Sequence, residues 1–197
     1  MKKKYAVIYL AAGNSRRFGS NKLLYLIEGK PMYLHVLERL IYFGEKHKEW
    51  EVLVVTQYRE ILENVQKLQE EGFAVSAVFS PESAQGASVS IRAGLTAAGE
   101  KEACVFCVAD QPYLTEHTVE SFLTFMEESG KEIGCVSWNG KSGNPVWFSN
   151  KFFPELMELS EDQGGKKVLK RHREEAVYFD LDEQKELEDI DELGYQN

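Results

Sequence analysis

Short apolar runs alternate with longer amphipathic segments along this chain, and this alternation limits it to few folds. Seven runs have the length and composition of strands: Tyr5–Ala11, Val52–Thr56, Ala74–Phe79, Ala103–Ala109, Ile133–Trp138, Pro145–Phe148 and Val177–Asp180. Six segments have helical period: Met32–Phe43, Glu60–Glu71, Ser88–Ala98, Glu116–Glu128, Lys151–Leu159 and Gly165–His172. The first strands are nearly continuous in apolar residues, as expected when helices cover both faces of a parallel sheet. The pattern predicts an α/β fold of three layers, αβα, with an open and predominantly parallel sheet.

The 197 residues suit one domain, and we expect a single domain over residues 1–197 because no linker, repeat or low-complexity tract interrupts them. Hydrophobic content of 43% excludes wholesale disorder. No apolar run approaches the roughly 18 residues of a membrane span. The basic start Met1–Lys4 is followed by a short apolar run and then by Gly13, so it is not typical of a signal peptide. We therefore expect a cytoplasmic protein without a membrane partner.

The net charge and the cysteines argue against nucleic-acid binding and against a zinc or redox site. The formal net charge is −9, which is poorly suited to nonspecific nucleic-acid binding, so we expect no nucleic-acid partner. The three cysteines lack the spacing of a disulfide framework, which fits a protein of a reducing compartment. Cys104 and Cys107 form a CxxC within the predicted strand Ala103–Ala109, where residues three apart point to opposite faces. We expect both to pack in the core and not to bind zinc or form a redox pair.

Polar or glycine-rich segments follow four of the predicted strands. These segments are Gly13–Lys22, Ser80–Ser90, Asp110–Pro112 and Asn139–Asn144. Ligands of open α/β sheets bind at the carboxyl ends of the strands. We therefore expect the four segments to gather at one edge of the sheet and to form the site there.

The first of these segments has the features of a phosphate-binding loop. Small residues at Ala11, Ala12 and Gly13, after Leu10, allow close approach to the backbone, whose N–H groups form a concave anion site. Arg17 and Lys22 add cations for phosphate oxygens. The Gly-Lys-Ser/Thr of a Walker loop and the Gly-x-Gly-x-x-Gly of dinucleotide-binding proteins are both absent. On these residues alone, an ordinary strand–helix turn with surface arginines remains an equal alternative.

The order Leu-Ala-Ala-Gly-x-Ser-x-Arg-x-Gly-x-x-Lys over residues 10–22 resembles the signature of nucleotidyltransferases with a glycosyltransferase-A-like, Rossmann-like fold. Within that MobA-like NTP transferase superfamily, the chain is most similar to the molybdenum cofactor cytidylyltransferases, with the guanylyltransferases as cousins. The resemblance covers essentially the whole chain. Its further matching segments are Lys22–Leu24, Gly29–Pro31, Gly86–Leu95, Ala109–Pro112, Gly143–Val146, Asp162–Gly164 and Asp189–Asp191.

The resemblance implies a role for each matching position. It implies catalytic roles for Arg17, Lys22 and Asp110. It implies that Asp110 and one of Asp189 or Asp191 bind Mg²⁺, a cation that prefers oxygen ligands. The nucleotide-binding positions that it implies are Leu10, Ala11, Ala12, Gly13, Arg17, Lys22, Gly86, Ser90 and Asp110. The acceptor-side positions that it implies are Asn144, Asp162 and Gly164.

Each assignment has a plain structural alternative. Asp110 would otherwise cap the turn before Pro112, and Asp162 would otherwise cap a helix start. Arg92 is expected to face outward and is left out of the site. Glu161 stands where the family has glycine, so the turn at Asp162 differs from the family pattern.

The resemblance implies transfer of CMP from CTP to the terminal phosphate of Mo-molybdopterin, giving molybdopterin cytosine dinucleotide and pyrophosphate. An apo-molybdoenzyme of the hydroxylase type would be the partner that takes the product. Use of GTP, another phosphorylated acceptor, and a non-catalytic chaperone of the molybdenum cofactor remain alternatives. A nucleotide-binding α/β protein with a different function is a further alternative.

Overall fold

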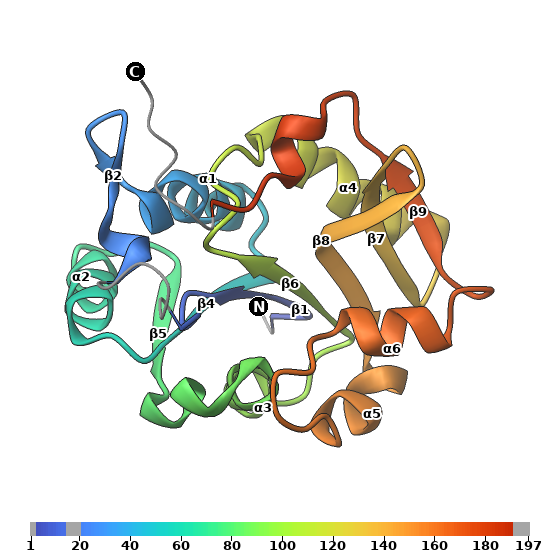
Figure 1. Ribbon diagram of the computed structural model, residues 1–197, viewed down its shortest axis with the longest axis horizontal. Helices are drawn as coiled ribbons and strands as arrows, with labels where there is room; N and C mark the ends of the chain where they lie inside the picture. The colour runs from blue at the N-terminus through green and yellow to red at the C-terminus, as the bar shows by residue number, and fades with distance from the viewer. Residues whose placement is uncertain (1–2, 15–20, 191–197) are drawn as a thin grey trace.

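The computed structural model describes residues 3–14 and 21–190, and its centre is a seven-stranded sheet (Figure 1). The strands are β1 (Tyr5–Leu10), β4 (Trp50–Thr56), β5 (Val75–Phe79), β6 (Ala103–Val108), β7 (Ile133–Trp138), β8 (Lys141–Ser149) and β9 (Val177–Asp180). Their order across the sheet is β5-β4-β1-β6-β8-β7-β9. β8 runs antiparallel to both of its neighbours, and the other described pairings in this sheet are parallel. The expectation of an open, predominantly parallel sheet is confirmed.

Helices cover both faces of the sheet and complete the expected three layers. In Figure 1, α1 (Met32–Lys46) and α4 (Glu116–Ser129) lie above the sheet. α3 (Ala87–Ala98), α5 (Phe153–Met157) and α6 (Lys166–Arg171) lie below it. α2 (Arg59–Glu70) packs at the β5 edge, and its buried residues join the core of α1. The short elements are the 3₁₀ turns η1 (Lys22–Leu24), η2 (Pro81–Gln85), η3 (Asn150–Phe152) and η4 (Gln184–Leu187), and the hairpin of β2 (Leu26–Ile27) with β3 (Lys30–Pro31).

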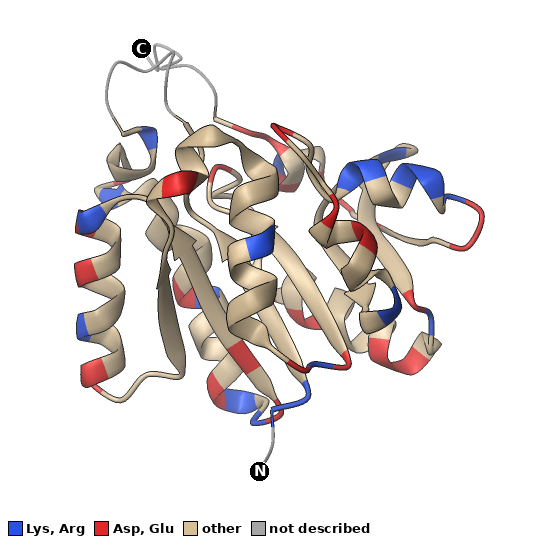
Figure 2. Ribbon diagram, turned by 90° about the horizontal axis from the view of Figure 1, so that it is seen from below, with Lys and Arg blue, Asp and Glu red and all other residues tan. Residues whose placement is uncertain are grey.

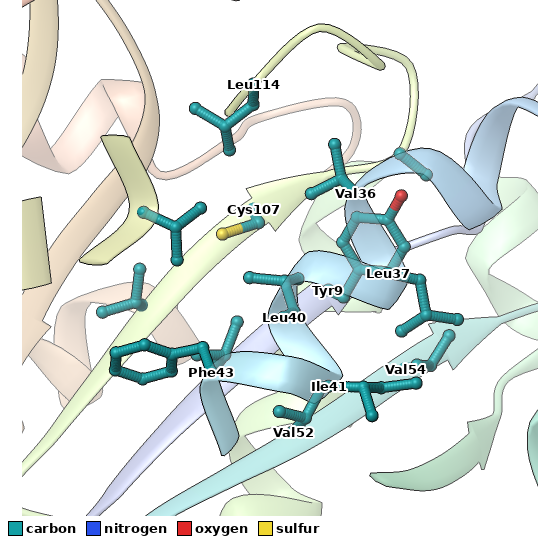
Figure 3. Close-up of a cluster of buried hydrophobic side chains, with 14 of the residues drawn as sticks. Tyr9, Val36, Leu37, Leu40, Ile41, Phe43, Val52, Val54, Cys107 and Leu114 are labelled. Atoms are coloured by element: carbon teal, nitrogen blue, oxygen red, sulfur yellow. The ribbon is translucent and has the colours of Figure 1, made fainter. Parts of the chain in front are cut away.

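The core has two halves because alternate strand residues face opposite sides of the sheet. On the α1 side, Leu37 and Leu40 pack with Tyr9 of β1 and Val54 of β4, as Figure 3 shows. Complete burial of such side chains stabilises the fold by about 1.5–3 kcal/mol each. The Tyr9 hydroxyl is also buried, and it donates a hydrogen bond to the Tyr33 carbonyl at 2.8 Å. This bond satisfies a polar group that would otherwise destabilise the core.

Cys104 and Cys107 lie on opposite faces of β6, in the two different halves of the core, as their spacing predicts. Both are free thiols, and so is buried Cys135. Burial raises the pKa of Cys104 to about 12 and raises that of Cys107 still further. Cys104 and Cys107 are therefore protonated packing groups.

Two predicted elements differ from the structure. The Pro145–Phe148 strand is longer, because it pairs with β7 through a hairpin at Asn139–Gly140 and so begins at Lys141. The helix expected over Lys151–Leu159 is split into η3 and α5, since Pro154 lies in the first turn of a new helix, where a proline is favoured.

Charged side chains lie mainly on helices and loops. In Figure 2 the strands are almost wholly tan, and α2 at the left carries both signs along its length. None of the helices in the described ranges has the length and apolar composition to span a membrane.

Candidate nucleotide-binding site

The polar segments meet at one edge of the sheet, as expected, where the described part of the chain shows them. Leu10 at the end of β1 pairs in register with Val55 of β4 and with Val108 of β6, so the three strands end level. Asp110 follows β6 after one residue, Ala109, and the Ser80–Ser90 segment follows parallel β5. Arg17 and Asp191 lie outside the described residues, and their roles stay predictions.

The first loop leaves the sheet one residue later than β1 itself ends. The backbone N–H of Ala11 donates to the Val55 carbonyl at 2.8 Å, and the Leu10 carbonyl accepts from the N–H of Ala109 at 3.2 Å. Because the Ala11 N–H continues the sheet ladder, it is not available to an anion. Ala12 is buried and Gly13 is exposed, so the backbone first reaches solvent at Gly13.

Lys22 and Asp110 form the central ion pair of the site. The Lys22 ammonium lies 3.0 Å from Asp110 Oδ2 and donates to the Ile190 carbonyl at 3.3 Å. Lys22 is only 7% exposed, because buried Leu23 beside it anchors η1 in the core. Asn21 caps η1 by accepting from the Leu23 N–H at 3.1 Å. A buried ammonium is retained only with partners of opposite polarity, and here they are the Asp110 carboxylate after β6 and the Ile190 carbonyl after η4.

The segment after η4 runs beside Asp110 and brings a second carboxylate to the same edge. The Ile190 N–H donates to the Asp110 carbonyl at 3.0 Å. The amide of Gln111 donates to Asp189 Oδ1 at 2.7 Å and to the Leu187 carbonyl at 3.2 Å. Asp189 thus lies near Asp110, in an irregular segment that belongs to neither a helix nor a strand.

Glu186 of η4 anchors this C-terminal segment from the other side. Its buried carboxylate accepts from the Thr115 N–H at 2.8 Å and from the Thr115 hydroxyl at 3.0 Å. Thr115 is also the N-cap residue of α4, where its hydroxyl accepts from the Thr118 N–H. Sequence patterns did not indicate Glu186, because its partner is 71 residues away in the chain.

The carboxylates at this edge fit a divalent cation that is shared with phosphates. Within residues 3–14 and 21–190, no group of three His, Cys, Asp or Glu side chains forms a cage for a metal ion. Mg²⁺ does not need such a cage, since one or two carboxylates with substrate phosphates and water complete its shell. Asp110 is suited to this role because its side chain is 30% exposed.

The Asp162–Gly164 segment docks directly on the start of α3. The Glu161 carbonyl accepts from the Ser88 hydroxyl at 2.7 Å and from the Ser88 N–H at 3.3 Å. Glu161 has φ +54°, a left-handed conformation that favours glycine, which explains why the family pattern has glycine at this position. The alternative in which Asp162 caps the start of a helix is wrong, because α6 begins at Lys166 and its N-cap residue is Gly165.

Gly86 is required by the same contact. It has φ +143°, and a Cβ there would lie 2.4 Å from the Glu161 carbonyl oxygen and 2.8 Å from Asp162 Oδ1. Ser90 is buried in the first turns of α3. Arg92, expected to face outward, is half-buried and donates to the Leu159 carbonyl, so it ties α3 to the chain before Asp162. The predicted nucleotide side and acceptor side are therefore in contact.

A cavity of about 170 Å³ lies beside this edge, between the β7–β8 hairpin and η4. It is lined by Gln111, Trp138, Lys141, Ser142, Gly143, Lys166, Gln184, Leu187, Glu188 and Asp189. Asn144, predicted on the acceptor side, follows Gly143 on β8 but does not line the cavity. Gln111 Oε1 is buried without a partner among the described residues, although its amide nitrogen is bonded. Sequence reasoning gave no role to Gln111, Trp138 or Lys141.

Comparison with known proteins accounts for this arrangement. The model of the MobA-like NTP transferase domain matches residues 7–176. The chain belongs to the MobA-like NTP transferase family. It is therefore a nucleotidyltransferase-like domain related to the enzymes of molybdenum cofactor biosynthesis, and the family resemblance seen in the sequence is confirmed.

Individual relatives of this MobA-like chain agree with the family. A probable molybdenum cofactor guanylyltransferase of Thermococcus sibiricus is 29% identical over 173 residues, which cover 87% of this chain and 76% of that protein. The purine catabolism protein PucB of Bacillus subtilis is 27% identical, and the match covers 97% of this chain and 94% of PucB.

The fold is similar to that of Rv0371c from Mycobacterium tuberculosis, with a TM-score of 0.73 at 20% identity over 92% of this chain and 89% of that one. Rv0371c has also been solved in complex with manganese.

Proposed function

We propose that this chain transfers CMP from CTP to the terminal phosphate of Mo-molybdopterin, releasing pyrophosphate. The observation that carries the proposal is the ion pair of buried Lys22 with half-buried Asp110 after β6, beside the glycine loop that follows β1. A cation and a carboxylate at the carboxyl edge of a parallel sheet suit a nucleoside triphosphate with its divalent metal. Family membership supports the reaction class, and the sequence resemblance to cytidylyltransferases favours CTP.

The reaction forms one bond and breaks one bond at the α-phosphorus. An oxygen of the acceptor's terminal phosphate attacks the α-phosphorus of CTP. The bond from the α-phosphorus to the oxygen that bridges to the β-phosphorus breaks, and pyrophosphate leaves with that electron pair. A phosphate monoester has a second pKa of about 6, so the attacking oxygen is largely ionised at neutral pH and needs no general base.

The protein's contribution is to hold the phosphates in line and to neutralise their charge. The Lys22 ammonium is fixed by η1 and the Ile190 carbonyl, so it can meet a phosphate oxygen with little loss of conformational entropy. Asp110, with Asp189 beside it, would hold Mg²⁺, which would neutralise charge on the α-phosphate and on the departing pyrophosphate. The manganese complex of Rv0371c supports a divalent cation in this fold.

The acceptor would lie on the α6 side of Asp110. The Asp162–Gly164 segment contacts the start of α3, and the cavity beside Gln111 is open between β8 and η4. Lys141 and Lys166 at that cavity supply cations for an anionic acceptor. An apo-molybdoenzyme of the hydroxylase type remains the partner that we expect to receive the product.

GTP is the second candidate nucleotide, because the Thermococcus sibiricus relative is named a guanylyltransferase. The test measures pyrophosphate release with Mg²⁺ and each of CTP, GTP, ATP and UTP, with and without Mo-molybdopterin. Release with CTP that depends on the pterin supports the proposal. Release with GTP alone keeps the reaction and changes the base. No release with any nucleotide, from folded protein and intact acceptor, refutes transfer to this acceptor.

A further inference from the structure

The start of the glycine loop is held from one side by two residues that follow β4. Gln57 Nε2 donates to the Ala12 carbonyl at 2.6 Å and to Asn14 Oδ1 at 3.2 Å. The Tyr58 hydroxyl donates to the Gly13 carbonyl at 2.7 Å. Three consecutive loop residues are thus bonded to two consecutive residues that lie outside the loop.

These bonds turn two successive carbonyls to the same side. Along a strand, successive carbonyls alternate between the two neighbouring strands. The last peptide of β1 fits this pattern, with its Leu10 carbonyl facing β6 and its Ala11 N–H facing β4. The carbonyls of Ala12 and Gly13 both face the residues after β4, which breaks the alternation.

The N–H groups of the next residues must then point the other way. In a planar trans peptide, the C=O and the N–H point in opposite directions. The Asn144–Pro145 bond is the only cis peptide of the described chain, so the two loop peptides are trans. The N–H groups of Gly13 and Asn14 therefore face away from the Gln57 amide and the Tyr58 hydroxyl, respectively.

Two successive N–H groups on one side form an anion-binding concavity. Neither N–H takes part in a hydrogen bond among the described residues of the chain. Gly13 has no Cβ, and a Cβ there would meet nothing within 4 Å, so sterics alone do not prevent its peptide from rotating. A rotated peptide would turn a carbonyl oxygen toward the anion.

We propose that Gln57 and Tyr58 are positioning residues that aim the N–H groups of Gly13 and Asn14 at the phosphates of the bound nucleoside triphosphate. The inference rests on the proposed function in so far as the anion is that of the nucleotide. Neither side chain touches the reacting atoms. Both act by holding carbonyl oxygens away from them.

The test uses Tyr58→Phe, which removes one hydroxyl, and Gln57→Met, which removes the amide but keeps the length. Tyr178→Phe is the matched control, because this tyrosine is exposed on β9 at the far edge of the sheet. The probes are CTP, GTP and inorganic pyrophosphate, each with Mg²⁺, in calorimetric titrations without the pterin. Thermal unfolding of each variant checks the fold.

Losing one such hydrogen bond is expected to weaken pyrophosphate binding by about 5–10-fold in Tyr58→Phe, with the same direction in Gln57→Met and no change in Tyr178→Phe. In ¹⁵N-labelled wild-type protein, pyrophosphate is expected to shift the amide signals of Gly13 and Asn14, and the shift is smaller in Tyr58→Phe. In turnover assays, KM for the nucleotide rises while kcat and KM for the acceptor are unchanged.

The outcomes separate the two proposals. Wild-type affinity in folded Tyr58→Phe and Gln57→Met overturns the positioning role. Wild-type protein that binds nucleotide but transfers nothing to the pterin refutes the proposed function and leaves the positioning role to be decided by the titrations. Wild-type protein that binds neither nucleotide nor pyrophosphate overturns both.

Discussion

The substitution Gly86→Ala tests the contact that joins the start of α3 to the Asp162–Gly164 segment. Gly86 has φ +143° and ψ 168°, a region that is essentially restricted to glycine, so alanine is strained there by about 1–3 kcal/mol. The new Cβ would also lie 2.4 Å from the Glu161 carbonyl oxygen and 2.6 Å from its carbon, so backbone has to move. The movement breaks the two hydrogen bonds from Ser88 to Glu161, at about 0.5–1.5 kcal/mol each.

The sum is a destabilisation of about 2–6 kcal/mol in the free energy of unfolding. For a domain of this size, each kcal/mol lowers Tm by about 2–4 °C. Differential scanning calorimetry measures the change directly, and limited proteolysis is expected to cleave the loop before α6 first. Turnover should fall as well, since the loop lies on the predicted acceptor side.

Gly72→Ala is the matched control. Gly72 also has a positive φ, +98°, but a Cβ there meets nothing within 4 Å. The substitution therefore introduces backbone strain without a steric clash like that of Gly86 with Glu161. We expect it to lower the free energy of unfolding by about 1–2 kcal/mol. The reasoning is refuted if Gly86→Ala is no more destabilising than Gly72→Ala, because the contact with Glu161 would then contribute nothing.

Two further predictions concern the packing of other segments. Hydrogen bonds to Glu175 and Glu155 raise the pKa of His172 above its ordinary 6.5, so its charged form stabilises the fold below that pH and the contribution is lost as pH rises through the raised pKa. His172→Gln should therefore lower Tm at pH 6, with the difference from wild type narrowing at higher pH; an equal difference at every pH contradicts the ion-pair explanation. Glu186→Ala leaves the Thr115 N–H without its buried acceptor and should destabilise the protein by about 1–3 kcal/mol in urea titrations while weakening turnover. A fully stable Glu186→Ala with reduced turnover would show that the residue acts on the site in another way.

The sheet and the main helices could be predicted because their signals are local. The apolar runs over β1, β4 and β6 have strand length, and the helix periods of α1 and α4 bury one face each. Asp110 could be placed for the same reason, since it follows a buried strand and the ligand edge of a parallel sheet is known. The loop signature added Lys22, and the two residues meet as expected.

The contacts that complete the site could not be predicted from patterns. Gln111 meets Asp189 across 78 residues, and Tyr58 meets Gly13 across 45. Such pairs are set by which strands are neighbours. Gln111 and Asp189 lie in two separate segments that match the family, whose pairing the pattern does not give, and Tyr58 lies in none of them. Glu161 carried a partial signal, because it replaces a family glycine at a position where the backbone is left-handed.

The central claim is tested most directly by following labelled phosphates of CTP. The protein is incubated with Mg²⁺, Mo-molybdopterin and CTP that carries ³²P at either the α or the γ position, and the products are separated. Asp110→Asn serves as the inactive variant, and exposed Asp182→Asn serves as its control. The account predicts that the α label enters a pterin dinucleotide while the γ label is recovered in pyrophosphate, with both lost in Asp110→Asn and retained in Asp182→Asn. Release of the γ label as inorganic phosphate, or α label that never reaches the pterin, would contradict nucleotidyl transfer by this site.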